Sequence, residues 1–161
     1  MAVLVQLALA LSCLLLSVAS SAASTTKEVV VIDLDMQINA GAEELVKRGV
    51  SYATSKPTTI EAFILQINTD GGYVYNMQNI LGLLARLSEE GIKTVALVAP
   101  EGARCRSAGA YIFMACDVTA MAPGTSVGAC MPVDLMGNPA SEKVVNALAA
   151  QMRGCLLYTS D

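Results

Sequence analysis

Ser107 lies in a segment that suits a serine nucleophile, Cys105-Arg106-Ser107-Ala108-Gly109-Ala110-Tyr111-Ile112. A serine nucleophile needs a base, an accessible position and N–H donors for the developing oxyanion. The chain contains no histidine, which excludes a Ser-His-Asp triad and most zinc sites. The base must therefore be a carboxylate or one of the five lysines, which are Lys27, Lys47, Lys56, Lys93 and Lys143.

Lys143 is the candidate base among these lysines. A lysine accepts a proton only when neutral, so its pKa must fall from about 10.4 to roughly 7–8. Lys143 lies near the start of a predicted apolar helix, where the helix dipole disfavours a cation. The alternative, which spacing alone favours, is a solvated lysine on a helix face. Lys27 lies at the mature N-terminus, Lys47 and Lys56 on a charged helix face, and Lys93 at the start of a strand.

The oxyanion donors are predicted from the small residues. The N–H of Ala108 is one candidate, because free N–H groups and the positive end of the dipole gather at a helix start. The Gly71-Gly72 pair supplies another, since glycine lets a substrate backbone approach closely. Two structural alternatives stand beside these roles: Ser107 as a helix N-cap, and Gly71-Gly72 as an ordinary tight turn.

These residues must be positioned by alternating strands and helices. Strands are predicted over 29–34, 62–67, 93–99 and 118–122, and helices over 40–55, 74–90, 107–116 and 140–153. Residues 68–72, 100–106 and 123–128 are predicted to be turns or loops. The strands are continuous apolar runs, which predicts an α/β fold whose parallel strands are covered on both faces. Because sites lie beyond the carboxyl ends of such strands, Gly71, Gly72 and Ser107 are expected on one edge of the sheet.

Composition limits the function classes. With 161 residues, 54% hydrophobic and 15% charged, the chain can form one domain with an ample core. The net charge of −4 and the lack of a basic patch interleaved with aromatic residues argue against nucleic-acid binding. The cysteine spacings match no metal motif. Cys105, Cys116 and Cys130 are expected to be buried free thiols, with Cys105 as a rival nucleophile beside Ser107.

The two ends of the chain differ from its middle. Residues 1–24 carry no charge, and an apolar stretch is followed by small residues, which predicts a secretory signal peptide over 1–23. The alternative is an uncleaved anchor, for which a stretch of about 16 residues is short. Residues 155–161 break the predicted helical pattern and resemble translated adapter sequence, so they are predicted to be a non-native tail. The domain is therefore predicted to span 27–154.

Three motifs together resemble the NfeD-type membrane-bound serine proteases of the ClpP-like clan. They are the Thr69-Asp70-Gly71-Gly72 turn, the Ser107-to-Ile112 helix, and the segment Ala122-Pro123-Gly124-Thr125-Ser126-Val127-Gly128. The resemblance implies a ClpP/crotonase-like spiral of βαβ units with mostly parallel strands. It also implies a Ser-Lys dyad, which falls on Ser107 and Lys143, and an oxyanion hole made by Gly71 or Gly72 with Ala108, with no metal or other cofactor.

The resemblance implies an extracytoplasmic, membrane-associated serine endopeptidase. Its substrates would be apolar segments of membrane-associated proteins, such as stomatin-like partners, in membrane protein quality control. We expect a homodimer or higher oligomer, attached to the membrane through a C-terminal region that lies outside this sequence. Asp70 replaces the family's usual proline, and its carboxylate is expected to weaken the oxyanion hole or alter substrate choice.

Three alternative functions stay open from the residues. An inactive ClpP-like scaffold at the membrane is one, and a signal-peptide-peptidase-like enzyme is another. The third, acyl-CoA chemistry on a crotonase-like fold, is disfavoured by the predicted leader because CoA substrates are intracellular.

Overall fold

The computed structural model describes residues 26–133 and 137–158. The strands are β1 (Glu28–Leu34), β2 (Ile60–Ile67), β3 (Lys93–Val98), β4 (Arg104–Arg106), β5 (Val118–Met121) and β6 (Ser126–Gly128). The helices are α2 (Ala40–Thr54), α3 (Val74–Glu89), α4 (Ala108–Met114) and α5 (Glu142–Tyr158). Every predicted strand and helix is present, and only the end of α5 differs by more than two residues. The predicted signal peptide lies outside the described residues.

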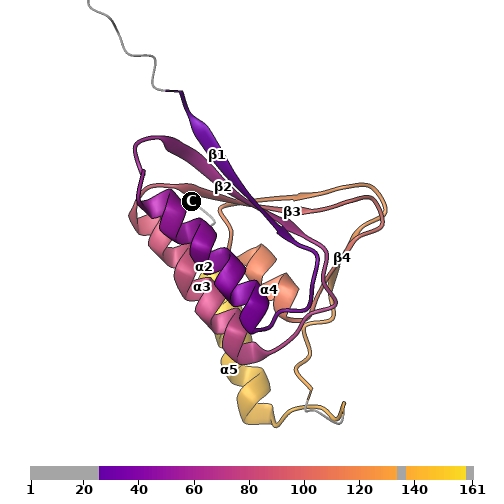
Figure 1. Cartoon of the computed structure of the whole chain (residues 1–161). Coiled ribbons are helices and arrows are strands. Elements are labelled where there is room, and N and C mark those ends of the chain that lie inside the picture. The colour runs from indigo at the N-terminus through magenta and orange to yellow at the C-terminus, as the bar shows by residue number, and fades with distance from the viewer. Residues whose placement is uncertain (1–25, 134–136, 159–161) are drawn as a thin grey trace, which may run out of the picture.

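The four longer strands form one parallel sheet in the order β1-β2-β3-β5. Helices α2 and α3 cross over between successive strands and pack together on the sheet (Figure 1). Helix α2 begins where the Asn39 side chain accepts hydrogen bonds from the N–H groups of Gly41 and Ala42, at 2.8 and 3.2 Å, as expected of an N-cap. Phe63, Leu65 and Ile67 of β2 are fully buried beneath these helices. Since the strands are parallel, all four end at one edge of the sheet.

The prediction that both faces of the sheet are covered is wrong. Helices α2 and α3 lie on one side of the sheet, and no helix covers its opposite side at β1 and β2 (Figure 1). Val31 pairs across the strands in one row with Ile64, Val95 and Val118, and Val31 and Val118 are 58% and 52% exposed. Valine favours an extended backbone on either face of a sheet, so a run of valines in the sequence does not determine whether one face or both are buried.

A second, two-stranded parallel sheet, β4 with β6, lies in segments that were predicted to be a loop and a turn. Cys105 in the middle of β4 is buried, whereas Arg104 and Arg106 on either side of it are exposed. An isolated bridge joins Thr69 to Cys105 and links this small sheet to the end of β2. A strand of three residues with two arginines shows no apolar pattern, which is why the sequence did not reveal it.

Two helices follow β4. Helix α4 is short, and its first six residues are buried. Helix α5 continues through Tyr158, so the predicted break of the helix at Cys155 is wrong. Leucines and a tyrosine at 156–158 are compatible with helix, and similarity to adapter sequence carries no information about backbone conformation. In the described part of the chain, no helix has both the length and the hydropathy to span a membrane.

Candidate active site

Ser107 stands between β4 and α4, where the chain turns sharply. Its N–H donates to the carbonyl of Gly128 at 2.9 Å, which ties the turn to the end of β6. Its backbone has φ 51° and ψ −121°, a region that residues other than glycine rarely adopt. The turn leaves Ser107 partly exposed at the start of a helix whose next six residues are buried.

Ser107 precedes the helix without capping it, so the N-cap alternative is wrong. A capping serine has an extended backbone, and its oxygen accepts a hydrogen bond from the second or third helical N–H group. Ser107 has a positive φ, and its side chain makes no cap hydrogen bond. Backbone strain of this kind costs on the order of 1–3 kcal/mol and concentrates at functional sites. The turn therefore presents, at the start of α4, a hydroxyl that has no hydrogen-bond partner among the described residues.

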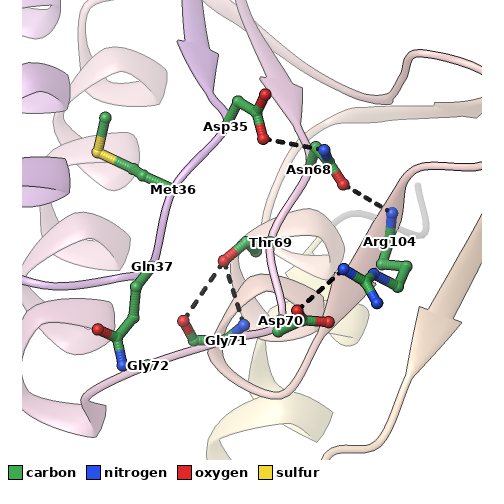
Figure 2. A pocket seen from close by; sticks show the side chains of 9 residues that line it. All are labelled: Asp35, Met36, Gln37, Asn68, Thr69, Asp70, Gly71, Gly72 and Arg104. Atoms are coloured by element: carbon green, nitrogen blue, oxygen red, sulfur yellow. Dashed lines mark hydrogen bonds and ion pairs between the residues drawn. The ribbon is translucent and has the colours of Figure 1, made fainter.

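The turn after β2 is fastened to the strand that leads to Ser107. The N–H of Thr69 donates to the carbonyl of Arg104 at 2.6 Å, and the N–H of Arg106 donates to the carbonyl of Thr69 at 3.0 Å. The amide of Asn68 extends this connection, since it donates to Asp35 at 2.9 Å and accepts from the N–H of Arg104 at 3.0 Å (Figure 2). The turn is thereby held against both β1 and β4.

Gly71 and Gly72 occupy positions that a side chain cannot share. Gly71 has φ 111°, and a methyl group on its Cα would lie 2.5 Å from the Cβ of Ser107 and 3.0 Å from its Oγ. A methyl group on Gly72 would collide with the backbone of Ile38, to which this segment is bridged. The expectation that Gly71, Gly72 and Ser107 share one edge is confirmed, and the pair is more than an ordinary tight turn.

A cavity of about 70 Å³ opens beside Ser107. Its lining brings together three predicted site residues, Gly72, Ser107 and Ala108. The remaining wall is mostly apolar and is formed by Val74, Met77, Tyr111, Cys130, Pro132, Val133 and Leu148. A larger cavity of about 390 Å³, open and more polar, lies next to Gly71 and Gly72 and includes Asp35, Asp70 and Arg104 in its lining (Figure 2).

The two glycine N–H groups differ in their partners. The N–H of Gly71 donates to Thr69 Oγ1 at 3.1 Å. The N–H of Gly72 has no acceptor among the residues that the structure describes. Ala108 is the first residue of α4, where an N–H group has no acceptor within the helix. Among the described residues, neither Gly72 N–H nor Ala108 N–H has an acceptor, and both residues line the cavity beside Ser107.

Residues 28–157 match the family model for the NfeD1b N-terminal domain. The chain belongs to the NfeD1b N-terminal domain family. It is 33% identical over 138 residues to the membrane protein NfeD1b of Bacillus subtilis, an alignment that covers 86% of this chain and 30% of that protein. It is also 42% identical over 73 residues to the membrane-bound protease PH1510 of Pyrococcus horikoshii, covering 45% of this chain and 16% of that protein. The chain thus spans less than a third of the length of either curated relative.

Solved structures show that the fold is ClpP-like. The domain resembles two structures titled as the 1510-N membrane-bound stomatin-specific protease, a lysine-to-alanine mutant with a substrate peptide and a serine-to-alanine mutant. The TM-scores are 0.70 and 0.71 at 30% identity, with 81% and 82% of this chain and 59% and 64% of those chains covered. ClpP1 from Listeria monocytogenes, at 17% identity and a TM-score of 0.56, shares the fold.

Lys143 lies in the first turn of α5, as predicted, but is exposed and does not line the cavity beside Ser107. The same helix reaches that cavity through Leu148, which is buried against it. The structure therefore brings Gly71, Gly72, Ala108 and Ser107 together, whereas Lys143 is not among the residues that line the cavity beside Ser107.

Sequence analysis did not identify Tyr111 as a residue of this cavity. Its hydroxyl donates to the carbonyl of Cys130 at 3.2 Å and fastens the segment that forms the far wall. Burial raises the pKa of the Tyr111 hydroxyl, with a smaller contribution from Cys130, which favours the protonated donor. The signal was its place in the first turns of the short helix that follows Ser107.

Cys105 is expected to resist alkylation in the native protein. Burial raises the pKa of its thiol to about 12, with a smaller contribution from Cys130. At pH 8 only about one such thiol in ten thousand is ionised, and the thiolate is the reactive form. Iodoacetamide followed by mass spectrometry should label the partly exposed Cys130 well before the fully buried Cys105. Rapid labelling of Cys105 would restore it as a rival nucleophile.

Proposed function

We propose that this domain is a serine peptidase that cleaves apolar segments of membrane-associated proteins with a Ser107–Lys143 dyad. The observation that carries the proposal is the hydroxyl of Ser107, which makes no cap hydrogen bond and is held by a strained turn in the lining of a cavity with mostly apolar walls. Two further observations support it. Free N–H donors of Gly72 and Ala108 line the same cavity, and related solved proteases carry one serine and one lysine replaced by alanine.

The chemistry follows from these groups. Ser107 Oγ attacks the carbonyl carbon of the scissile peptide bond, and neutral Lys143 Nζ takes the hydroxyl proton. The N–H groups of Gly72 and Ala108 bind the oxyanion of the tetrahedral intermediate. Protonated Lys143 then gives its proton to the leaving amine, and the C–N bond breaks. Water hydrolyses the acyl-enzyme, with Lys143 again as the base, and the serine is regenerated.

Because Lys143 does not line the cavity beside Ser107, the proposed mechanism includes an approach of Lys143 to Ser107. A general base acts within about 3 Å of the proton donor, and such contacts often tighten only when substrate is bound. We infer that substrate in the cavity draws the first turn of α5 toward Ser107, with Leu148 as the fixed point of the helix.

The substrate class is inferred from the surroundings of Ser107. Val74, Met77 and Leu148 give the cavity an apolar wall that would bind an apolar side chain next to the scissile bond. Further apolar surface is exposed in or next to the segments that line the cavity, by the side chains of Tyr73, Tyr75, Met131 and Val133. Stomatin-like substrates, an extracytoplasmic location and a role in membrane protein quality control belong to the same proposal. We also propose that the protein forms a homodimer or a higher oligomer.

Lys143→Ala is expected to lower kcat by at least about a hundredfold, with little change in stability because the side chain is exposed. The measurement is cleavage of apolar peptides by wild type and by Lys143→Ala, with Lys143→Arg as a variant that keeps the charge but cannot act as a base. Lys47→Ala, which removes another exposed helical lysine, is the matched control. Full activity in Lys143→Ala would assign the base to another residue.

An inactive binding module is the second candidate, and the exposed position of Lys143 favours it. Such a module would bind apolar peptides in the cavity beside Ser107 and release them intact. Folded wild-type protein that binds apolar peptides but shows no cleavage dependent on Ser107 would support this function instead.

A further inference from the structure

Asp70 forms ion pairs with two arginines of β4, Arg104 and Arg106. One of its carboxylate oxygens lies 3.1 Å from Arg104 Nη2, and the other lies 3.6 Å from Arg106 Nη1. Side chains alternate along a strand, so Arg104 and Arg106 project from one face of β4 while Cys105 is buried on the other. One carboxylate thus spans the two arginines, and Figure 2 shows its contact with Arg104 beside the Gly71–Gly72 turn.

The ion pairs connect the glycine turn to the strand that leads to Ser107, at the point where these two segments lie closest together. Asp70 directly precedes Gly71, whose Cα lies against Ser107, and Arg106 directly precedes Ser107. The backbone of Thr69 is already bonded to both arginine residues. A shift of the turn along β4 by one residue would break the backbone bonds and both ion pairs together.

The carboxylate of Asp70 is paired with two arginine side chains, which its residue type alone does not predict. Two positive charges balance it, and Asp70 lines the larger polar cavity but not the apolar cavity beside Ser107. The three side chains are about half exposed, at 61%, 50% and 46% for Asp70, Arg104 and Arg106. A single pair at such exposure contributes little, whereas several charges in a network with shared geometry contribute more.

We propose that Asp70 is a positioning residue, which acts through Arg104 and Arg106 to hold the glycine turn in register with Ser107. The inference rests on the proposed peptidase function and deepens it. A proline at this position would restrict the turn by fixing its own φ. Here the ion pairs of Asp70 with Arg104 and Arg106 form a clamp that restricts the turn by tying it to β4. The N–H of Asp70 has no acceptor among the described residues, so a proline there would remove no hydrogen bond.

Asp70→Ala is expected to lower kcat about fivefold with KM nearly unchanged, because the apolar cavity stays intact while the oxyanion donors lose alignment. Asp70→Arg should be worse, since it places three like charges together. Combining Asp70→Arg with Arg104→Asp and Arg106→Asp restores the pairing with reversed signs and should recover most of the kcat. Glu44→Ala, which removes a similarly exposed carboxylate from its pair with Lys47, is the matched control.

Rescue by proline gives a second arm. Arg104→Gln with Arg106→Gln should lower kcat like Asp70→Ala, and adding Asp70→Pro should restore it. Equal kcat in wild type and Asp70→Ala, or failure of both the charge-reversed triple variant and the proline variant to recover activity, would overturn the proposal.

Hydrogen exchange separates this inference from the peptidase proposal. The amide of Gly71 is bonded to Thr69 Oγ1, so its exchange reports the order of the turn without any need for cleavage. Asp70→Ala should accelerate that exchange several-fold, whereas Glu44→Ala should leave it unchanged. Accelerated exchange in a domain that cleaves nothing would retain the clamp and reject the peptidase, and unchanged exchange would reject the clamp itself.

Discussion

Ser107→Ala is expected to abolish peptide cleavage and to leave the free energy of unfolding within about 0.5 kcal/mol of the wild-type value. Loss of a nucleophilic serine costs about a millionfold in kcat in a well-studied protease. The hydroxyl makes no cap hydrogen bond and is partly exposed, so its removal takes little from the folded state. Cleavage assays on apolar peptides, paired with urea unfolding of the same preparations, measure both quantities.

The stability half of this experiment distinguishes a strained nucleophile from a cap. Loss of a capping serine costs about 1 kcal/mol on replacement by alanine and a few tenths on replacement by glycine. Ser107→Gly should instead be more stable than wild type by roughly 1 kcal/mol, because φ 51° with ψ −121° suits glycine. A Ser107→Ala variant that unfolds about 1 kcal/mol more easily, or that still cleaves, contradicts the assignment.

The sequence predicted the layered parallel fold because its signals are local and redundant. Apolar strands alternate with helices, and residues that commonly end a helix mark the helix boundaries in the sequence. Gly91, predicted as a C-cap, follows the end of α3 with φ 71°, and its N–H donates to the carbonyl of Ser88 at 3.0 Å. The juxtaposition of Gly71 with Ser107 also followed, since parallel strands deliver their loops to one edge.

Features that depend on distant contacts could not be predicted in the same way. β4 is a strand only because β6 and Thr69 supply its partners. The positive φ of Ser107 is imposed by its neighbours and has no signature in the residues around it. The position of Lys143 depends on how α5 docks through Leu148, which the spacing from Ser107 does not specify. The pairing of Asp70 with Arg104 and Arg106 depends on β4 being a strand, because only alternating side chains place both arginines on one face. The sequence predicts a loop there.

Gly71→Ala is expected to lower kcat/KM by at least about a hundredfold, the range seen when one oxyanion donor is lost. Its new methyl group would lie 2.5 Å from Ser107 Cβ and 3.0 Å from the carbonyl oxygen of Arg106. Neither neighbour can yield freely, because Ser107 is held through its N–H and Arg106 through its bond to Thr69. The turn must therefore move away from Ser107 and carry the N–H of Gly72 with it.

The expected loss in Gly71→Ala combines a contact with a backbone conformation, and Gly91→Ala separates the two. Gly91 also has a positive φ, of 71°, but open space surrounds its Cα, and it lies at the end of α3 remote from the carboxyl edge of the sheet. Its replacement should cost about 1 kcal/mol in unfolding free energy and leave kcat/KM unchanged. If both variants lose stability alike and both keep their activity, contact between Gly71 and Ser107 has no part in catalysis. Loss of activity in Gly71→Ala alone would identify that contact as the element that aligns the oxyanion donor with the nucleophile.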